Sequence, residues 1–334
     1  MKKLIVLTVL LLNIFACSQT NENPKPMNQD KITIENYKEK MLSEIKHYPQ
    51  EPMYYIYVHN NLCLYEMLVN DYPIEKRFEY STSGTPFYIN TAILKSGKQK
   101  LTFRMYPAPK EYNEGSDVLD QYASLEFKIY VNNNATGLKM ANEKKVLEGA
   151  AKQINYEDSS QKYFEGKGKK YYEFTVEFDA QVPYSLESWT AGEDLRKFDQ
   201  KKLEEKALSI YDYYRDNVSG DKITNIVGIH YTKNIRDMIT EYETRDKVNS
   251  IYNSLIKISE TKKEWQNFGH KIVFNGDGRI LTLEQSNDSD DRLRGRSALF
   301  YLYNDEDNVK MSYDIYLPLY IPKGGTIDDL QVLR

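Results

Sequence analysis

Cysteine and histidine are scarce, since the 334 residues include only two cysteines and four histidines. Zinc sites usually draw their ligands from short spacings such as HExxH, HxH or CxxC, and the sequence contains none of them. The four histidines are His47, His59, His230 and His270. The acidic cluster Asp288, Asp290 and Asp291 does not form a calcium loop, because Arg292 and Leu293 stand where that loop needs a ligand and a glycine. We therefore predict no metal and no other cofactor.

Glycine patterns that would bind phosphate are missing too. The segment Ser96-Gly97-Lys98 resembles the end of the P-loop sequence motif. Ala92, however, stands where that motif needs its first glycine. Gly166 and Gly168 lack the third glycine of a dinucleotide fingerprint. Both segments are more typical of hairpin turns.

Signals for a nucleophile are weak. Gly295-Arg296-Ser297 begins like a nucleophile elbow, but Leu299 replaces the second glycine. Cys63 lies in a strand-like setting, where a free cysteine behaves as a small buried hydrophobic residue. A nucleophilic thiol needs an activating partner, and His59 lies four residues away, but the strand pattern does not establish a contact. We predict no catalytic residue and no enzyme activity. A hydrolase with an unrecognised site remains an alternative, because the spacing of 49 acidic residues cannot identify a carboxylate pair.

Basic residues are not in excess, and the net charge is −4. A mildly acidic chain without a basic arm is not attracted to nucleic acid, so we expect no nucleic-acid partner. Tyrosine, by contrast, is abundant at 29 residues, which indicates much β-structure. A group of tyrosines is a second candidate for a binding surface, although tyrosines on helices more often pack in the core: Tyr211, Tyr213, Tyr214, Tyr231 and Tyr242.

The N-terminus has the pattern of an export signal. Lys2 and Lys3 precede a short apolar run, which is too short to span a bilayer. The run ends in Ile14-Phe15-Ala16-Cys17, which resembles the lipobox of bacterial lipoproteins, although Phe15 departs from the small residue usual at its position. The resemblance implies that residues 1–16 are a signal peptide, which is cleaved off before Cys17. It also implies that Cys17, the first residue of the mature chain, is acylated. Several acyl chains anchor a protein stably to a membrane. The alternatives are an ordinary signal peptide with an incidental cysteine and a short uncleaved anchor.

The segment that follows is typical of a tether. Residues 17–30 are rich in Asn, Gln, Ser, Thr and Pro and show no apolar periodicity. Ser18 is not the aspartate that favours retention in the inner membrane, and only Glu22 is acidic near the cysteine. We therefore expect a protein of the cell envelope, lipid-anchored to the outer membrane and facing the periplasm.

The first part of the mature chain, residues 31–185, is predicted to be an antiparallel β-sandwich. A short helix at 31–47 precedes segments of alternating polarity at 53–59, 62–69, 87–94, 101–106, 122–131 and 171–182, and residues 140–154 are predicted to be a helical insertion. We expect the first two segments to pair through a turn at Asn60-Asn61. The turn chemistry between Val69 and Arg104 resembles jelly-roll accessory domains, which implies a jelly-roll-like sandwich that supports or binds carbohydrate.

The second part, residues 193–334, is predicted to be an α+β domain. Apolar residues at helical spacing predict helices at 195–218 and from 248 to 258 or 265. Strands at 271–275 and 280–284 surround Gly276-Asp277-Gly278, and a second hairpin joins 297–303 to 310–321. The whole chain is therefore predicted to be α+β, with a mainly β part followed by helices and then an antiparallel sheet.

Three arginines form the candidate partner-binding site. Arg292, Arg294 and Arg296 alternate, so an extended segment would project all three guanidinium groups to one face. Such groups suit carboxylates on a protein partner. The alternative is a charged loop neutralised by the nearby aspartates.

These observations favour a non-catalytic, protein-binding lipoprotein of the envelope, either a scaffold or a toxin-neutralising immunity protein. Its partners would be the membrane, through lipid on Cys17, and an envelope or toxin protein. A carbohydrate-binding lipoprotein is the first alternative, and the hydrolase is the second.

Overall fold

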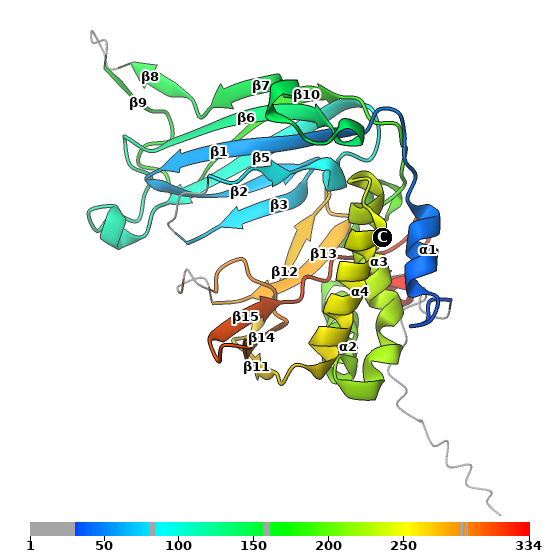
Figure 1. Cartoon of the computed structure of the whole chain (residues 1–334). Coiled ribbons are helices and arrows are strands. Elements are labelled where there is room, and N and C mark those ends of the chain that lie inside the picture. The colour runs from blue at the N-terminus through cyan, green and yellow to red at the C-terminus, as the bar shows by residue number, and fades with distance from the viewer. Residues whose placement is uncertain (1–30, 80–83, 156–160, 288–289, 291–292) are drawn as a thin grey trace, which may run out of the picture.

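A computed structural model describes residues 31–79, 84–155, 161–287, 290 and 293–334. The fold is α+β, as predicted: antiparallel strands come first, helices follow, and further antiparallel sheets complete the chain. In Figure 1 the sandwich lies above a second unit of helices and short sheets. No helix among the described residues combines the length and the apolar character needed to cross a bilayer.

Two four-stranded antiparallel sheets form the sandwich (Figure 1). The first sheet has the order β4 (Phe87–Tyr88), β1 (Pro52–Asn61), β6 (Ser124–Asn133), β7 (Lys144–Ala150). The second has the order β10 (Tyr172–Ala180), β5 (Gly97–Pro107), β2 (Cys63–Val69), β3 (Tyr72–Arg77). A separate two-stranded sheet of β8 (Gln153–Asn155) and β9 (Lys162–Phe164) follows β7 along the chain. Alternate residues of the strands, such as Ile56, Phe103 and Phe127, fill the core between the sheets.

The predicted pairing of the first two strands is wrong. β1 and β2 lie in different sheets, and Leu62 between them adopts a left-handed backbone with φ 50°. The chain crosses at this point because both strands bury apolar faces, which pack against each other across the core. The next turn does form a hairpin: Asn70 and Asp71 both have positive φ, the geometry that a two-residue loop requires.

The predicted helical insertion at 140–154 is also wrong. Only Met140–Asn142 forms a single 3₁₀ turn, and β7 and β8 follow it. β7 pairs with the open edge of β6, and Val146 and Leu147 pack against the sandwich core, so tertiary contacts override the local helical pattern. Similarly, the strand expected at 87–94 is limited to β4, because the chain turns at Asn90–Ala92.

The second unit contains four helices and two small sheets among the described residues. The helices are α1 (Tyr37–Glu44), α2 (Gln200–Asn217), α3 (Val227–Thr240) and α4 (Arg245–Glu260). One sheet has the order β11 (Glu264–Gln266), β14 (Phe300–Asn304), β15 (Lys310–Asp314). The other has the order β12 (His270–Asn275), β13 (Ile280–Gln285), β16 (Leu319–Tyr320), β17 (Gln331–Val332).

Most of the predictions for this unit are confirmed. The two long helices appear as α2 and α4, and the two hairpins appear as β12–β13 and β14–β15. α3 was not predicted; most of its residues are buried, including the polar side chains of His230, Thr232 and Arg236. α1 forms as expected, but Tyr37 and Met41 pack in the core of the second unit, where the Tyr37 hydroxyl lies 2.9 Å from Nδ1 of His230.

Two buried polar side chains join the sandwich to α3. The side chain of Asn90 accepts a hydrogen bond from the backbone N–H of Tyr54 at 2.7 Å. It donates hydrogen bonds to the carbonyls of Pro52 and Thr240, both at 2.9 Å. The guanidinium of Arg236 lies 4.4 Å from the ring centre of Tyr72, which stacks on Trp189. These contacts fix the relative position of the two units.

Candidate functional site

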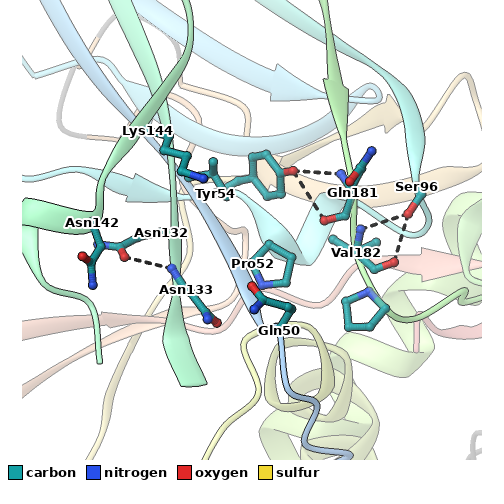
Figure 2. A pocket seen from close by; sticks show the side chains of 12 residues that line it. Gln50, Pro52, Tyr54, Ser96, Asn132, Asn133, Asn142, Lys144, Gln181 and Val182 are labelled. Carbon is teal, nitrogen blue, oxygen red and sulfur yellow. Dashed lines mark hydrogen bonds between the residues drawn. The ribbon is translucent and has the colours of Figure 1, made fainter. Parts of the chain in front are cut away.

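A cavity of about 610 Å³ opens at one end of the sandwich (Figure 2). Its walls come from the start of β1, the end of β6, the start of β7 and the segment that follows β10. The lining residues are Gln50, Pro52, Tyr54, Ser96, Val131, Asn132, Asn133, Asn142, Lys144, Gln181, Val182 and Pro183. Five of these twelve are asparagine or glutamine, and none is acidic.

The wall on the side of β10 is held by two hydroxyl groups (Figure 2). The Tyr54 hydroxyl accepts the backbone N–H of Gln181 at 2.8 Å and donates to its carbonyl at 3.4 Å. Ser96 Oγ accepts the N–H of Val182 and donates to its carbonyl, both at 2.9 Å. Burial raises the pKa of Tyr54, which keeps this hydroxyl protonated. The backbone is therefore fixed, while the side chain of Gln181 stays exposed.

The opposite wall is held by two neighbouring asparagines at the end of β6. Asn132 donates to the carbonyl of Lys139 at 2.9 Å and accepts the N–H of Asn133 at 2.8 Å. Asn133 Oδ1 accepts the backbone N–H of Glu51 at 2.9 Å. These bonds position the loop that carries Asn142 at the rim.

Three amide side chains and one ammonium group remain available at the rim. Gln50, Asn142, Gln181 and Lys144 are exposed, and their side chains make no hydrogen bond to any residue that the structure describes. The apolar part of the lining consists of Pro52, Val131, Val182 and Pro183. An amide group both donates and accepts hydrogen bonds, which matches a ligand rich in hydroxyl groups. The apolar lining suits the C–H faces of such a ligand.

The predicted arginine site has a different geometry. Arg292 lies outside the described residues, and residues 293–295 form a turn, so the expected extended segment is not found there. The guanidinium of Arg294 lies over the rings of Phe78 and Tyr106, at 4.3 and 4.5 Å from their centres. Arg296 instead makes a bidentate contact with another strand, and both arginines border the same hollow beside β3.

That contact joins Arg296 to Asp314 of β15. Arg296 Nε donates to Oδ1 at 3.1 Å and Nη2 donates to Oδ2 at 2.6 Å. Among the described residues, Asp314 is thus the aspartate that pairs with Arg296; Asp288 and Asp291 lie outside the described residues. Both described arginines are engaged by their own chain, and their role in binding a partner stays a prediction.

The two weak nucleophile signals do not gain a partner for catalysis. Ser297 is buried, where its hydroxyl donates to the carbonyl of Ile315 at 2.7 Å and accepts the N–H of Leu299. Cys63 is buried too, its thiol donates to the carbonyl of Ser124, and burial raises its pKa to about 12. Neither contact involves a histidine or a carboxylate. Among the described residues, no group of three or more potential ligands is placed to hold a metal ion.

The tyrosine cluster suggested by the sequence is part of the core. All five tyrosines are buried in the described structure: Tyr211, Tyr213, Tyr214, Tyr231 and Tyr242. The alternative of core packing therefore holds for this group. Exposed tyrosines occur elsewhere, on the sandwich.

Sequence reasoning did not find the amide-lined cavity. Its residues lie between positions 50 and 183, and each one is an ordinary turn or strand-end residue in the sequence. The run Asn132-Asn133-Asn134 is the single local signal, and it indicates a turn. Cys17 and the predicted tether lie outside the described residues. No protein family, curated protein or solved structure matches this chain.

Proposed function

We propose that this chain is a non-catalytic carbohydrate-binding protein of the cell envelope, tethered by lipid on Cys17. The observation that carries the proposal is the set of unengaged amides around the cavity: Gln50, Asn142 and Gln181. Binding sites for neutral, hydroxyl-rich ligands need groups that can donate and accept, placed beside an apolar surface. This cavity offers both, whereas the predicted arginine site is occupied by contacts within the chain.

The cavity is suited to a neutral sugar more than to a strongly charged one. Lys144 is the single charged residue of the lining, and the other polar groups are amides and hydroxyls. An acidic sugar with one carboxylate fits as well, with Lys144 as its counter-charge. The turn sequence between Val69 and Arg104, which resembles that of jelly-roll accessory domains, agrees with a carbohydrate ligand, although a fold alone does not determine a ligand.

Binding to an array of neutral and acidic oligosaccharides tests the proposal, followed by calorimetry with the best ligand. The double variant Asn142→Ala/Gln181→Ala removes two amides and is expected to lose about 2 kcal/mol of binding, or roughly 30-fold in affinity. Asn253→Ala is the matched control, because Asn253 is an exposed amide on α4 in the other unit. Unchanged affinity in the double variant would contradict the assignment of the cavity.

The tether has its own test. Mass spectrometry of the mature protein is expected to find acyl groups on Cys17 and no residues of the leader. Cys17→Ser is expected to release the protein from the membrane fraction, because the acyl chains provide its attachment. An unmodified thiol at Cys17 in the native protein would refute the lipoprotein assignment.

A protein partner is the second candidate, and one feature favours it. Val309 is 52% exposed and Met311 is 42% exposed at the β14–β15 hairpin. Exposed apolar side chains of this kind occur at protein interfaces. A Val309→Ser/Met311→Ser variant that still captures the partner found with the unaltered protein would exclude this hairpin as the contact.

A further inference from the structure

Four tyrosines gather on the outer side of the first sheet, and we name this surface the tyrosine face: Tyr55, Tyr57, Tyr88 and Tyr130. In the register of the sheet, Tyr55 of β1 stands opposite Tyr88 of β4 on one side and Tyr130 of β6 on the other. The ring centres are 5.9 and 6.1 Å apart along this row. Tyr57 lies beside it, 5.8 Å from Tyr130.

The tyrosine face points away from the core of the sandwich. Tyr54, Ile56 and Val58 belong to the core, so strand alternation turns Tyr55 and Tyr57 outward. Tyr57 is 36% exposed and Tyr88 is 42% exposed. Packing explains Tyr55, which is buried beneath its neighbours, but it does not explain why two more rings remain open to solvent.

The hydroxyl groups at this face are available as well. Within the described part of the chain, the hydroxyls of Tyr57, Tyr88 and Tyr130 form no hydrogen bond, whereas Tyr55 donates to Glu143 Oε1 at 2.5 Å. The face thus presents apolar rings with polar rims, a combination suited to ligands that are apolar on one side and hydroxylated at their edges.

The tyrosine face adjoins the amide-lined cavity. Asn132 lines the cavity and lies two residues beyond Tyr130 on β6, a distance of about 7 Å along a strand. Glu143, the partner of Tyr55, lies between two other lining residues, Asn142 and Lys144. A ligand that leaves the cavity over the end of β6 therefore meets the tyrosine row directly.

We propose that the tyrosine face is an extension subsite that holds further sugar units of a polysaccharide chain whose end lies in the cavity. This inference rests on the proposed carbohydrate-binding function. The row from Tyr130 to Tyr88 spans two strand spacings, about 10 Å, which exceeds the width of one sugar ring. The C–H faces of sugar rings stack on the tyrosine rings, while their hydroxyls reach the tyrosine hydroxyls.

Chain length is the variable that tests this subsite. The probes are linear cello-, chito- and malto-oligosaccharides of two and of six units, with affinities measured by calorimetry. The full chain is expected to bind the longer member of the preferred series about tenfold more tightly than the shorter one. Tyr57→Ala/Tyr88→Ala is expected to remove that gain and leave the affinity for the two-unit ligand unchanged.

Three further variants separate the possible causes. Tyr122→Ala is the matched control, because Tyr122 is an exposed tyrosine outside the face, and it is expected to keep the gain. Tyr57→Phe/Tyr88→Phe keeps the rings and is expected to keep most of the gain, which also guards against a loss caused by misfolding. Asn142→Ala/Gln181→Ala is expected to weaken both lengths equally.

Equal affinity for both lengths in the unaltered protein would overturn the subsite while leaving the cavity assignment intact. A loss of affinity for both lengths in Tyr57→Ala/Tyr88→Ala would overturn it too. If no oligosaccharide binds and a protein is instead captured through the tyrosine face, both the proposed function and this inference fail.

Discussion

The amide-lined cavity and a second hollow of about 310 Å³ show how differently two polar regions of one molecule are used. The second hollow, which we name the charged groove, lies between β3 and residues 294–297. Two of its charged side chains are already paired: Lys76 with Glu284, and Arg296 with Asp314. The hydroxyl of Tyr316, which also lines it, is buried and has no hydrogen-bond partner in the described structure. The cavity has uncharged amides, three of which have no partner in the described structure.

The charged groove is a joint between the two units. Arg294 belongs to the second unit and covers Phe78 and Tyr106 of the sandwich, and Lys76 of β3 reaches Glu284 of β13. Groups satisfied within the protein have less to offer a ligand, because binding must first break the existing contacts. In this molecule the concentrated charge is used for contacts between the two units, whereas exposed amides without a partner in the described structure surround the cavity.

The largest expected effect distinguishes Asn90, which is buried between the sandwich and α3, from Asn142 at the rim of the cavity. Asn90→Ala leaves the buried N–H of Tyr54 and the carbonyl of Thr240 without a partner, and is expected to lower the free energy of unfolding by about 3 kcal/mol. Asn142→Ala removes an exposed amide and is expected to change it by less than about 0.5 kcal/mol. Urea unfolding with unchanged m-values measures both. An equal loss of unfolding free energy in the two variants would contradict the view that Asn90 is structural and Asn142 is free to bind a ligand.

A smaller effect is expected in the charged groove. Arg296→Met removes a bidentate ion pair with Asp314 and is expected to lower the free energy of unfolding by about 1 kcal/mol. The difference should shrink at high salt, because screening weakens the ion pair. Lys310→Met is the matched control, since its pair with Glu264 is more than half exposed, and it should have almost no effect. If Arg296→Met leaves stability unchanged but abolishes capture of a protein partner, the groove is a binding site after all.

Local patterns predicted much of the fold. The hairpin through Asn70-Asp71 and the one through Gly276-Asp277-Gly278 were predictable, because their turn residues adopt the positive φ values that such loops need. The helices α2 and α4 were predictable because each buries one face only. The same reasoning failed for α3, most of whose residues are buried, and for β7, which the open edge of β6 recruits.

The candidate site was beyond sequence reasoning for a related reason. Gln50, Asn132 and Gln181 come from distant parts of the chain, and the pairing of β1 with β6 and of β5 with β10 brings them together. The three arginines were conspicuous in sequence because they alternate, yet Arg294 and Arg296 contact different partners within the protein. Their alternation predicted an extended segment, but residues 293–295 form a turn.

The most direct test of carbohydrate binding at the cavity is a titration of the ¹⁵N-labelled protein with the best oligosaccharide, followed through the side-chain NH₂ signals by NMR. The signals of Gln50, Asn142 and Gln181 are expected to shift with a common dissociation constant, while that of Asn253 on α4 stays in place. Saturable binding that leaves the three cavity amides unshifted would contradict the account.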